Sequence, residues 1–135
     1  MDDLDAKILA ILLRNAREPF VNIASKVGTS EGTVRARVKR LLDDGVIRQF
    51  TVRTAGRGVK ALVEVKIAAN VNTGDVSAKI AGWDSVEQVW EVAGENDIVV
   101  LVDASSTGRL NEVVERIRSL HETAGTQSRL ILKEL

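Results

Sequence analysis

Hydrophobic positions in the first 54 residues recur at helical spacing in three successive segments. Such spacing predicts helices that each bury one face. The first segment covers residues 4–17, the second covers residues 20–28, and the third covers about residues 31–44. Gly28 and the capping residue Ser30 separate the last two segments. Two helices, a short break that contains glycine and a further helix are the order of a helix-turn-helix motif.

The third of these helices combines an apolar stripe with a cluster of basic residues. The stripe consists of Val34, Val38, Leu41 and Leu42. The basic side chains are therefore expected to project from the face that is not packed. A solvated helix surface is one interpretation of such a charge run, and contact with DNA is the other. The order of the surrounding elements favours DNA.

A recognition helix uses its first turns to contact base edges and its later cations to contact phosphates. Arginine can also bind guanine through two hydrogen bonds. We therefore predict double-stranded DNA as a partner of this helix and of the segment that follows it. The candidate DNA-binding residues are Ser30, Thr33, Arg35, Arg37, Lys39, Arg40 and Arg48.

The chain leaves the third helix through an alternating, β-branched segment, "VIRQFTVRT", at residues 46–54. This pattern predicts a strand or small wing that exposes Arg48. The glycine-rich stretch "AGRGV" follows at residues 55–59 and is the expected domain boundary. We expect a helix-turn-helix domain over residues 1–54, a connector over residues 55–60 and a second domain over residues 61–135.

The second domain alternates between strand and helix patterns. Strand patterns lie at residues 61–69, 85–94, 98–104 and 128–135, and helical patterns lie at residues 75–83 and 106–121. The order βαββαβ is the ferredoxin-like split βαβ arrangement. The fold class is thus α+β, with an N-terminal winged helix-turn-helix followed by a ferredoxin-like module. The helices cover one face of the sheet, and a second copy is the simplest cover for the other, so we expect a homodimer.

Composition narrows the function classes. Of the 135 residues, 44% are hydrophobic and 28% are charged, which is typical of a globular protein. The absence of cysteine and the single histidine argue against disulfides and a metal site. The apolar runs are too short to cross a bilayer and the acidic start is unlike a signal peptide, so we expect a cytoplasmic protein. Because no nucleophile–base pair or cofactor loop is present, we predict neither an enzyme nor a cofactor.

Charge is divided unevenly although the formal net charge is zero. Residues 1–54 carry ten Lys and Arg against seven Asp and Glu, whereas residues 55–135 carry nine against twelve. A mildly basic first half and a mildly acidic second half indicate two different roles in one chain.

The whole chain resembles the Lrp/AsnC family of bacterial and archaeal regulators, in an archaeal-type form. The resemblance rests on "LDAKILAILLRNAR", then "IASKVGTSEGTVRARVKRLLDDGVI", then "VWEVAGENDIVVLVDA" inside a βαββαβ module. It implies a helix-turn-helix domain joined to an amino-acid-sensing module. It also implies dimers that assemble further, up to an octamer, and a free amino acid bound where dimers meet.

The turn "GEND" at residues 94–97 is the candidate effector site. Gly, Asn and Asp are common in hairpin turns, so an ordinary turn is the alternative. The resemblance implies that this turn lines the effector pocket, with Asn96 at a position where an aromatic residue is common. A carboxylate suits an α-ammonium group, and backbone N–H groups suit an α-carboxylate. The candidate effector-binding residues are Gly94, Glu95, Asn96, Asp97, Gln127 and Ser128.

These features favour a DNA-binding transcription regulator that responds to a small amino acid with a polar or basic side chain. One alternative is an architectural DNA-binding protein that senses no effector. Another is a ferredoxin-like regulatory subunit or enzyme whose helical domain binds protein instead of DNA.

Overall fold

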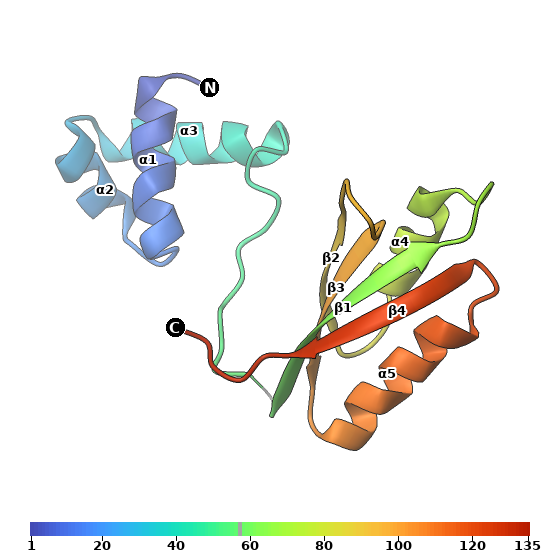
Figure 1. The fold of residues 1–135 in the computed structure, drawn as a ribbon. Helices are drawn as coiled ribbons and strands as arrows, with labels where there is room; N and C mark the ends of the chain where they lie inside the picture. Colours follow the sequence, from blue (N-terminus) through green and yellow to red (C-terminus); the bar gives the residue numbers. More distant parts are fainter. Residues whose placement is uncertain (57) are drawn as a thin grey trace. The chain divides into compact units, whose positions relative to one another are not determined.

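The computed structural model describes residues 1–56 and 58–135, whose contacts separate into two units, Met1–Arg53 and Thr54–Leu135 (Figure 1). The first unit is helical and the second contains the sheet. Within these residues, no helix has the length and apolar character needed to cross a membrane.

Three helices form the first unit: α1 (Asp3–Arg14), α2 (Phe20–Val27) and α3 (Glu31–Asp43). The Asp2 carboxylate caps α1 by accepting from the backbone N–H of Asp5. Helix α2 ends at Gly28, whose φ of 75° is in the left-handed region that glycine adopts readily. Ser30 caps α3, as the sequence predicts, by accepting from the backbone N–H of Thr33.

One side chain cluster holds the three helices together. Its buried members are Ile8, Leu12, Ile23, Ala24, Val34 and Val38. The predicted stripe on α3 is confirmed at Val34, Val38 and Leu41, which are buried. The prediction is wrong for Leu42, which lies at the edge of the stripe and is exposed.

The strand or wing predicted at residues 46–54 is not formed. The segment is extended, and no strand pairs with it among the residues that the structure describes. Its start is fixed, since the Ile47 N–H donates to the carbonyl of Leu41 at 2.9 Å. Alternating side chains suit a strand, but a strand also needs a neighbour for its backbone hydrogen bonds.

The second unit is a four-stranded antiparallel sheet in the order β2-β3-β1-β4. Its strands are β1 (Val59–Ile67), β2 (Val86–Glu91), β3 (Ile98–Ala104) and β4 (Thr123–Leu130). Helix α4 (Thr73–Ala81) connects β1 to β2, and α5 (Thr107–Ser119) connects β3 to β4. The predicted ferredoxin-like order and the α+β fold class are confirmed.

Both helices contribute to the core on one face of the sheet. Val76 and Ile80 of α4 and Val113 and Ile117 of α5 belong to the same buried cluster as the inward side chains of β1 and β3. Among the described residues of this unit, no helix packs on the other face. Register places Trp90, Val99, Glu64 and Gln127 in one row across that open face.

The strands depart from the sequence pattern in two ways that affect this row. Regular alternation would place Val86 and Trp90 on one face, but a register shift between Val86 and Gln88 separates them, and Trp90 is 39% exposed and lies outside the core. A bulge of this kind adds one residue and reverses the alternation. The last strand also begins at Thr123, earlier than the predicted residue 128, because the polar stretch before it pairs with β1.

Two contacts on α5 replace the ion pair that sequence spacing suggests. Glu112 and Arg116 have the i,i+4 spacing of such a pair, but Arg109 Nη1 lies 3.0 Å from the Glu112 carboxylate instead. The Arg116 guanidinium lies over the Trp83 ring, 4.0 Å from its centroid. An aromatic face attracts a cation, so the ring competes with the carboxylate for this arginine.

We expect Gly28→Ala to lower the free energy of unfolding by about 1 kcal/mol, because alanine is strained at a positive φ. Gly32→Ala is the matched control. Gly32 lies in the first turn of α3 with open space around its Cα, so alanine there should be neutral or stabilising by up to about 1 kcal/mol. Thermal unfolding followed by circular dichroism measures both. Equal effects of the two changes would contradict the assigned role of Gly28.

Candidate functional site

All four basic residues of α3 have acidic partners. Arg35 Nη2 lies 2.8 Å from the Glu31 carboxylate, and Lys39 Nζ lies 2.7 Å from the Asp43 carboxylate. Both pairs span one helical turn and are exposed to solvent. Exposed pairs of this kind are weak, since water solvates each charge well and salt screens their attraction. The two cations can therefore leave their partners for a stronger anion.

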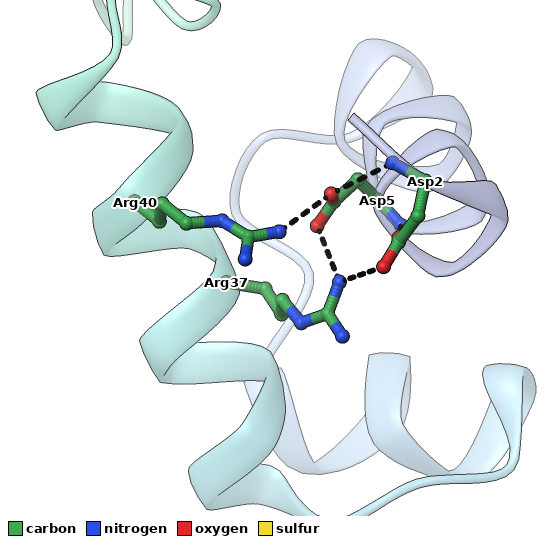
Figure 2. Close-up of polar contacts among 4 residues, drawn as sticks. All are labelled: Asp2, Asp5, Arg37 and Arg40. Atoms are coloured by element: carbon green, nitrogen blue, oxygen red, sulfur yellow. Dashed lines mark hydrogen bonds and ion pairs between the residues drawn. The ribbon is translucent and has the colours of Figure 1, made fainter.

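Arg37 and Arg40 reach instead to the start of α1, where Asp2 and Asp5 lie (Figure 2). Arg37 Nη1 donates to the Asp2 carboxylate and also to Asp5 Oδ1 at 3.2 Å. Arg40 Nη2 donates to Asp5 Oδ2 at 2.8 Å. The expectation that these side chains project from an unpacked face is therefore wrong for Arg37, which is 26% exposed, and holds only in part for Arg40, which is 52% exposed.

These contacts stabilise the charged forms of the groups involved. The hydrogen bond from Arg37 holds the pKa of Asp2 well below its usual range. The pKa of Asp5 is also lowered, first by the hydrogen bond that its carboxylate accepts from the backbone N–H of Asp2 and then by the one from Arg37. The two carboxylates in turn raise the pKa of Arg37. Asp5 is fully buried as a residue, so it depends on these partners for solvation.

The remaining DNA-binding candidates are placed differently. Ser30 Oγ and Thr33 Oγ1 lie 2.9 Å apart, and the Ser30 hydroxyl also caps the helix. Both residues thus lie at the exposed start of α3 with their hydroxyls hydrogen-bonded locally. Arg48 is exposed on the extended segment after α3 and forms no ion pair within residues 1–56 and 58–135.

A shallow pocket of about 240 Å³ lies on the open face of the sheet beside the turn at residues 94–97. Of the predicted effector-binding residues, it brings together Gly94, Glu95, Asn96 and Gln127. Gly94 has a φ of 138°, which only glycine adopts without strain, so the turn depends on it. Residues of the turn after β2 and a residue of β4, which are far apart in the sequence, thus line one hollow.

Asp97 and Ser128 do not line this pocket. The Asp97 carboxylate accepts from the backbone N–H of Ile67 at 2.8 Å, at the bulge where β1 loses its regular register with β4. Its backbone also bonds to Val65 and Val92. Ser128 pairs with Val63, whose side chain is in the core, so the alternation of β4 places Ser128 on the helix-covered face, opposite to Gln127.

Two lining residues escape a sequence-based search. Glu64 and Arg129 complete the pocket, and their charged groups lie 3.5 Å apart. Glu64 falls on the outward face of the strand predicted at residues 61–69, so the alternation of that strand could have identified it as a candidate. Arg129 reaches the pocket only because β4 pairs with β1 in a register that places it beside Leu62.

Residues 1–42 match the AsnC-type helix-turn-helix domain, and residues 60–135 match the Lrp/AsnC ligand binding domain. The chain belongs to the Lrp/AsnC family. Each domain match falls within one of the two units of the fold.

Related proteins agree with this membership. The HTH-type transcriptional regulator LysM of Saccharolobus solfataricus is 36% identical over 134 residues, which cover 98% of this chain and 94% of the relative. The HTH-type transcriptional regulator AldR of Mycolicibacterium smegmatis is 35% identical over 143 residues, which cover 100% and 83%. The relatives are thus named as transcriptional regulators and not as enzymes.

Solved Lrp/AsnC structures share the fold. The crystal structure of MtbAldR has a TM-score of 0.85 at 27% identity, covering 100% of this chain and 96% of that one. A transcriptional regulator of Neisseria meningitidis in complex with L-Met has a TM-score of 0.83 at 26% identity, covering 100% and 92%. The chain is therefore a DNA-binding regulator of the effector-responsive type.

In this Lrp/AsnC chain, we expect Asp97→Ala to lower the free energy of unfolding by about 1–3 kcal/mol, because the Ile67 N–H loses its acceptor. Glu95→Ala, two residues away, is the control and should change it by less than about 0.5 kcal/mol, since Glu95 is exposed. Urea denaturation measures both. If the two variants were equally stable, the Asp97 carboxylate would not have the structural role described.

Proposed function

We propose that this Lrp/AsnC regulator binds double-stranded DNA through α3 and changes that binding when a free amino acid occupies the pocket beside Gly94. The observation that supports both parts is the match of one family domain to each unit. The L-Met complex of the Neisseria meningitidis regulator supports an amino acid as the class of effector.

The candidate DNA-binding residues differ in their position along the chain and in how strongly each is bound by other side chains of the protein. Ser30, Thr33 and Arg35 lie in the first turns of α3, the part of a recognition helix that meets base edges. Lys39, Arg40 and Arg48 lie further along the chain and suit phosphates. We do not assign base reading to Arg37, because its guanidinium is bound to Asp2 and Asp5.

On the effector side, charge favours a basic amino acid. Glu64, Glu95 and Arg129 give the pocket lining a formal charge of −1, and the nearby Lys66 Nζ contacts the backbone carbonyl of Glu95, at 3.4 Å. A bound zwitterion uses one carboxylate for its ammonium and Arg129 for its carboxylate. One acidic side chain then remains, and a cationic ligand side chain neutralises it. Gln127 and Asn96 supply further hydrogen bonds.

The open face of the sheet supports assembly of this protein. Leu62, Val99 and Leu101 are only half-buried there, and the Trp90 side chain lies beside them. Apolar side chains of this size favour cover by a second copy. We therefore propose a cytoplasmic homodimer that assembles further, up to an octamer. A monomeric mass in light scattering would contradict this proposal.

Arg35→Ala and Lys39→Ala should each reduce the slope of log affinity for duplex DNA against log salt by about one, because each cation neutralises one phosphate. Lys7→Ala is the control. Lys7 is an exposed cation of α1 that pairs with Asp3 in the same i,i+4 manner, so the change in net charge is identical. Fluorescence anisotropy with a labelled duplex across a potassium chloride series measures the slopes. If all three slopes agreed, α3 would not be the DNA-contacting helix, and an absence of binding would favour the protein-binding alternative.

L-lysine or L-arginine at one hundred times its dissociation constant should stabilise the protein by about 2.7 kcal/mol, and L-methionine and L-glutamate at that same concentration should stabilise it less. Glu64→Gln should remove the preference for a basic ligand. Glu115→Gln is the control, because Glu115 lies on α5 and pairs with Arg118 outside the pocket. Differential scanning fluorimetry measures these shifts.

The outcomes of that screen separate the hypotheses. If a neutral amino acid stabilised the protein and basic ones did not, the charge argument would be wrong while sensing stood. If no standard amino acid shifted the melting curve at millimolar concentration, the architectural alternative would replace the sensor.

A further inference from the structure

We infer that Asp5 is a positioning residue for DNA binding: it holds the Arg40 guanidinium at the surface of α3, ready to contact a phosphate. This inference rests on the proposed role of α3 in DNA binding. It means that the Asp5 carboxylate, although it is an anion, strengthens the binding of another anion, the DNA phosphate.

The position of the Asp5 carboxylate is fixed from two directions. The capping box at the start of α1 holds it, because the Asp2 N–H donates to Asp5 Oδ2 at 3.1 Å while the Asp5 N–H donates to Asp2 Oδ1 at 2.9 Å. The two arginines of α3 then bind one carboxylate oxygen each (Figure 2). The residue is fully buried, so no water competes for these contacts.

The two arginines have different roles in this arrangement. Arg37 is mostly buried and donates through the same Nη1 atom to both Asp2 and Asp5, so it joins α3 to α1. Arg40 is half exposed and donates to Asp5 through Nη2 alone. A guanidinium has five N–H donors, which leaves Arg40 donors for a second anion. Arg40 also follows Thr33 by seven residues, so the two lie on one edge of α3.

Holding Arg40 in advance reduces the entropy lost on binding. A free arginine side chain loses much of its rotamer freedom when it contacts a phosphate. Asp5 restricts that freedom before DNA arrives and leaves the outer side of the guanidinium exposed. A buried acceptor behind an exposed donor is the arrangement by which a supporting side chain orients a binding group.

The sign of the effect distinguishes positioning from simple electrostatics. A carboxylate close to DNA repels phosphates, so its removal ordinarily strengthens binding. Asp3 provides the matched control, because it lies in the same helical turn, is 84% exposed and pairs only with Lys7. Asp5→Asn and Asp3→Asn remove the same charge from the same end of α1. Opposite effects of the two changes have no explanation in net charge.

The test measures anisotropy of a labelled mixed-sequence duplex across a potassium chloride series, at a temperature where circular dichroism shows each variant folded. We expect Asp5→Asn to weaken binding on the order of threefold to tenfold. Asp3→Asn should bind equally or more tightly. Arg40→Ala should lower the salt slope by about one, and Asp5→Asn with Arg40→Ala should bind no more weakly than Arg40→Ala alone.

Arg37→Met separates positioning from loss of structure. It breaks the contact between α1 and α3 but leaves Arg40 on Asp5, so it should lower the melting temperature and keep the wild-type salt slope. The inference is overturned if Asp5→Asn binds as tightly as Asp3→Asn, if its effect adds to that of Arg40→Ala, or if Arg37→Met lowers the salt slope as Arg40→Ala does. Failure of the wild type to bind any duplex would instead overturn the proposed function and this inference with it.

Discussion

In the second unit, both crossover helices pack on one face of the four-stranded antiparallel sheet, so the side chains on the other face are left without a cover from these helices. This constraint organises the unit. The covered face holds the apolar core, with Val63, Val65 and Val100 fully buried. The open face holds apolar side chains only half removed from water, together with the Glu64–Arg129 pair. The candidate effector pocket lies on that face, so the proposed ligand binding and the proposed association between copies would share one surface of the unit.

In the helical unit, every basic residue of α3 forms an ion pair with an acidic residue, but these pairs differ in strength. Partners one turn away in α3 are exposed and are easily replaced by a phosphate. Partners at the start of α1 are fixed by a capping box and by burial of Asp5. The surface that we propose for DNA therefore has cations with exposed partners one turn away beside cations held by α1.

Local signals predicted most of the fold. The serine cap and the glycine stop that bracket the turn before α3, and the βαββαβ order, follow from residues close together in sequence. What failed depends on distant partners. Residues 125–127 have weak strand propensity and precede the strand predicted at residues 128–135, yet pairing with β1 makes them part of β4. The face of Trp90 depends on a bulge that no alternation reveals.

The candidate sites show the same division. The turn beside Gly94 was selected because the resemblance to the Lrp/AsnC family implies that it lines the effector pocket, whereas Arg129 required the register of two strands. Arg37 and Arg40 were expected to project freely from α3. Their partners were missed because they lie more than thirty residues earlier in the chain. One signal was available: Asp5, Ile8 and Leu12 follow the i, i+3, i+7 spacing of a buried face. A carboxylate on such a face requires a cationic or hydrogen-bonding partner.

The three bonds made by Asp97 limit how the pocket can respond to a ligand. They tie one end of the turn to Val65, Ile67 and Val92, whereas the rest of the turn is contacted at the Glu95 carbonyl by Lys66 Nζ, at 3.4 Å. At the site that we propose for an effector, a ligand would therefore meet a stiff framework immediately beyond Gly94, Glu95 and Asn96. Its binding would then change the shape of a short rim rather than deform the strands. Such a signal would pass outward, to whatever touches the rim, before it passes along the chain.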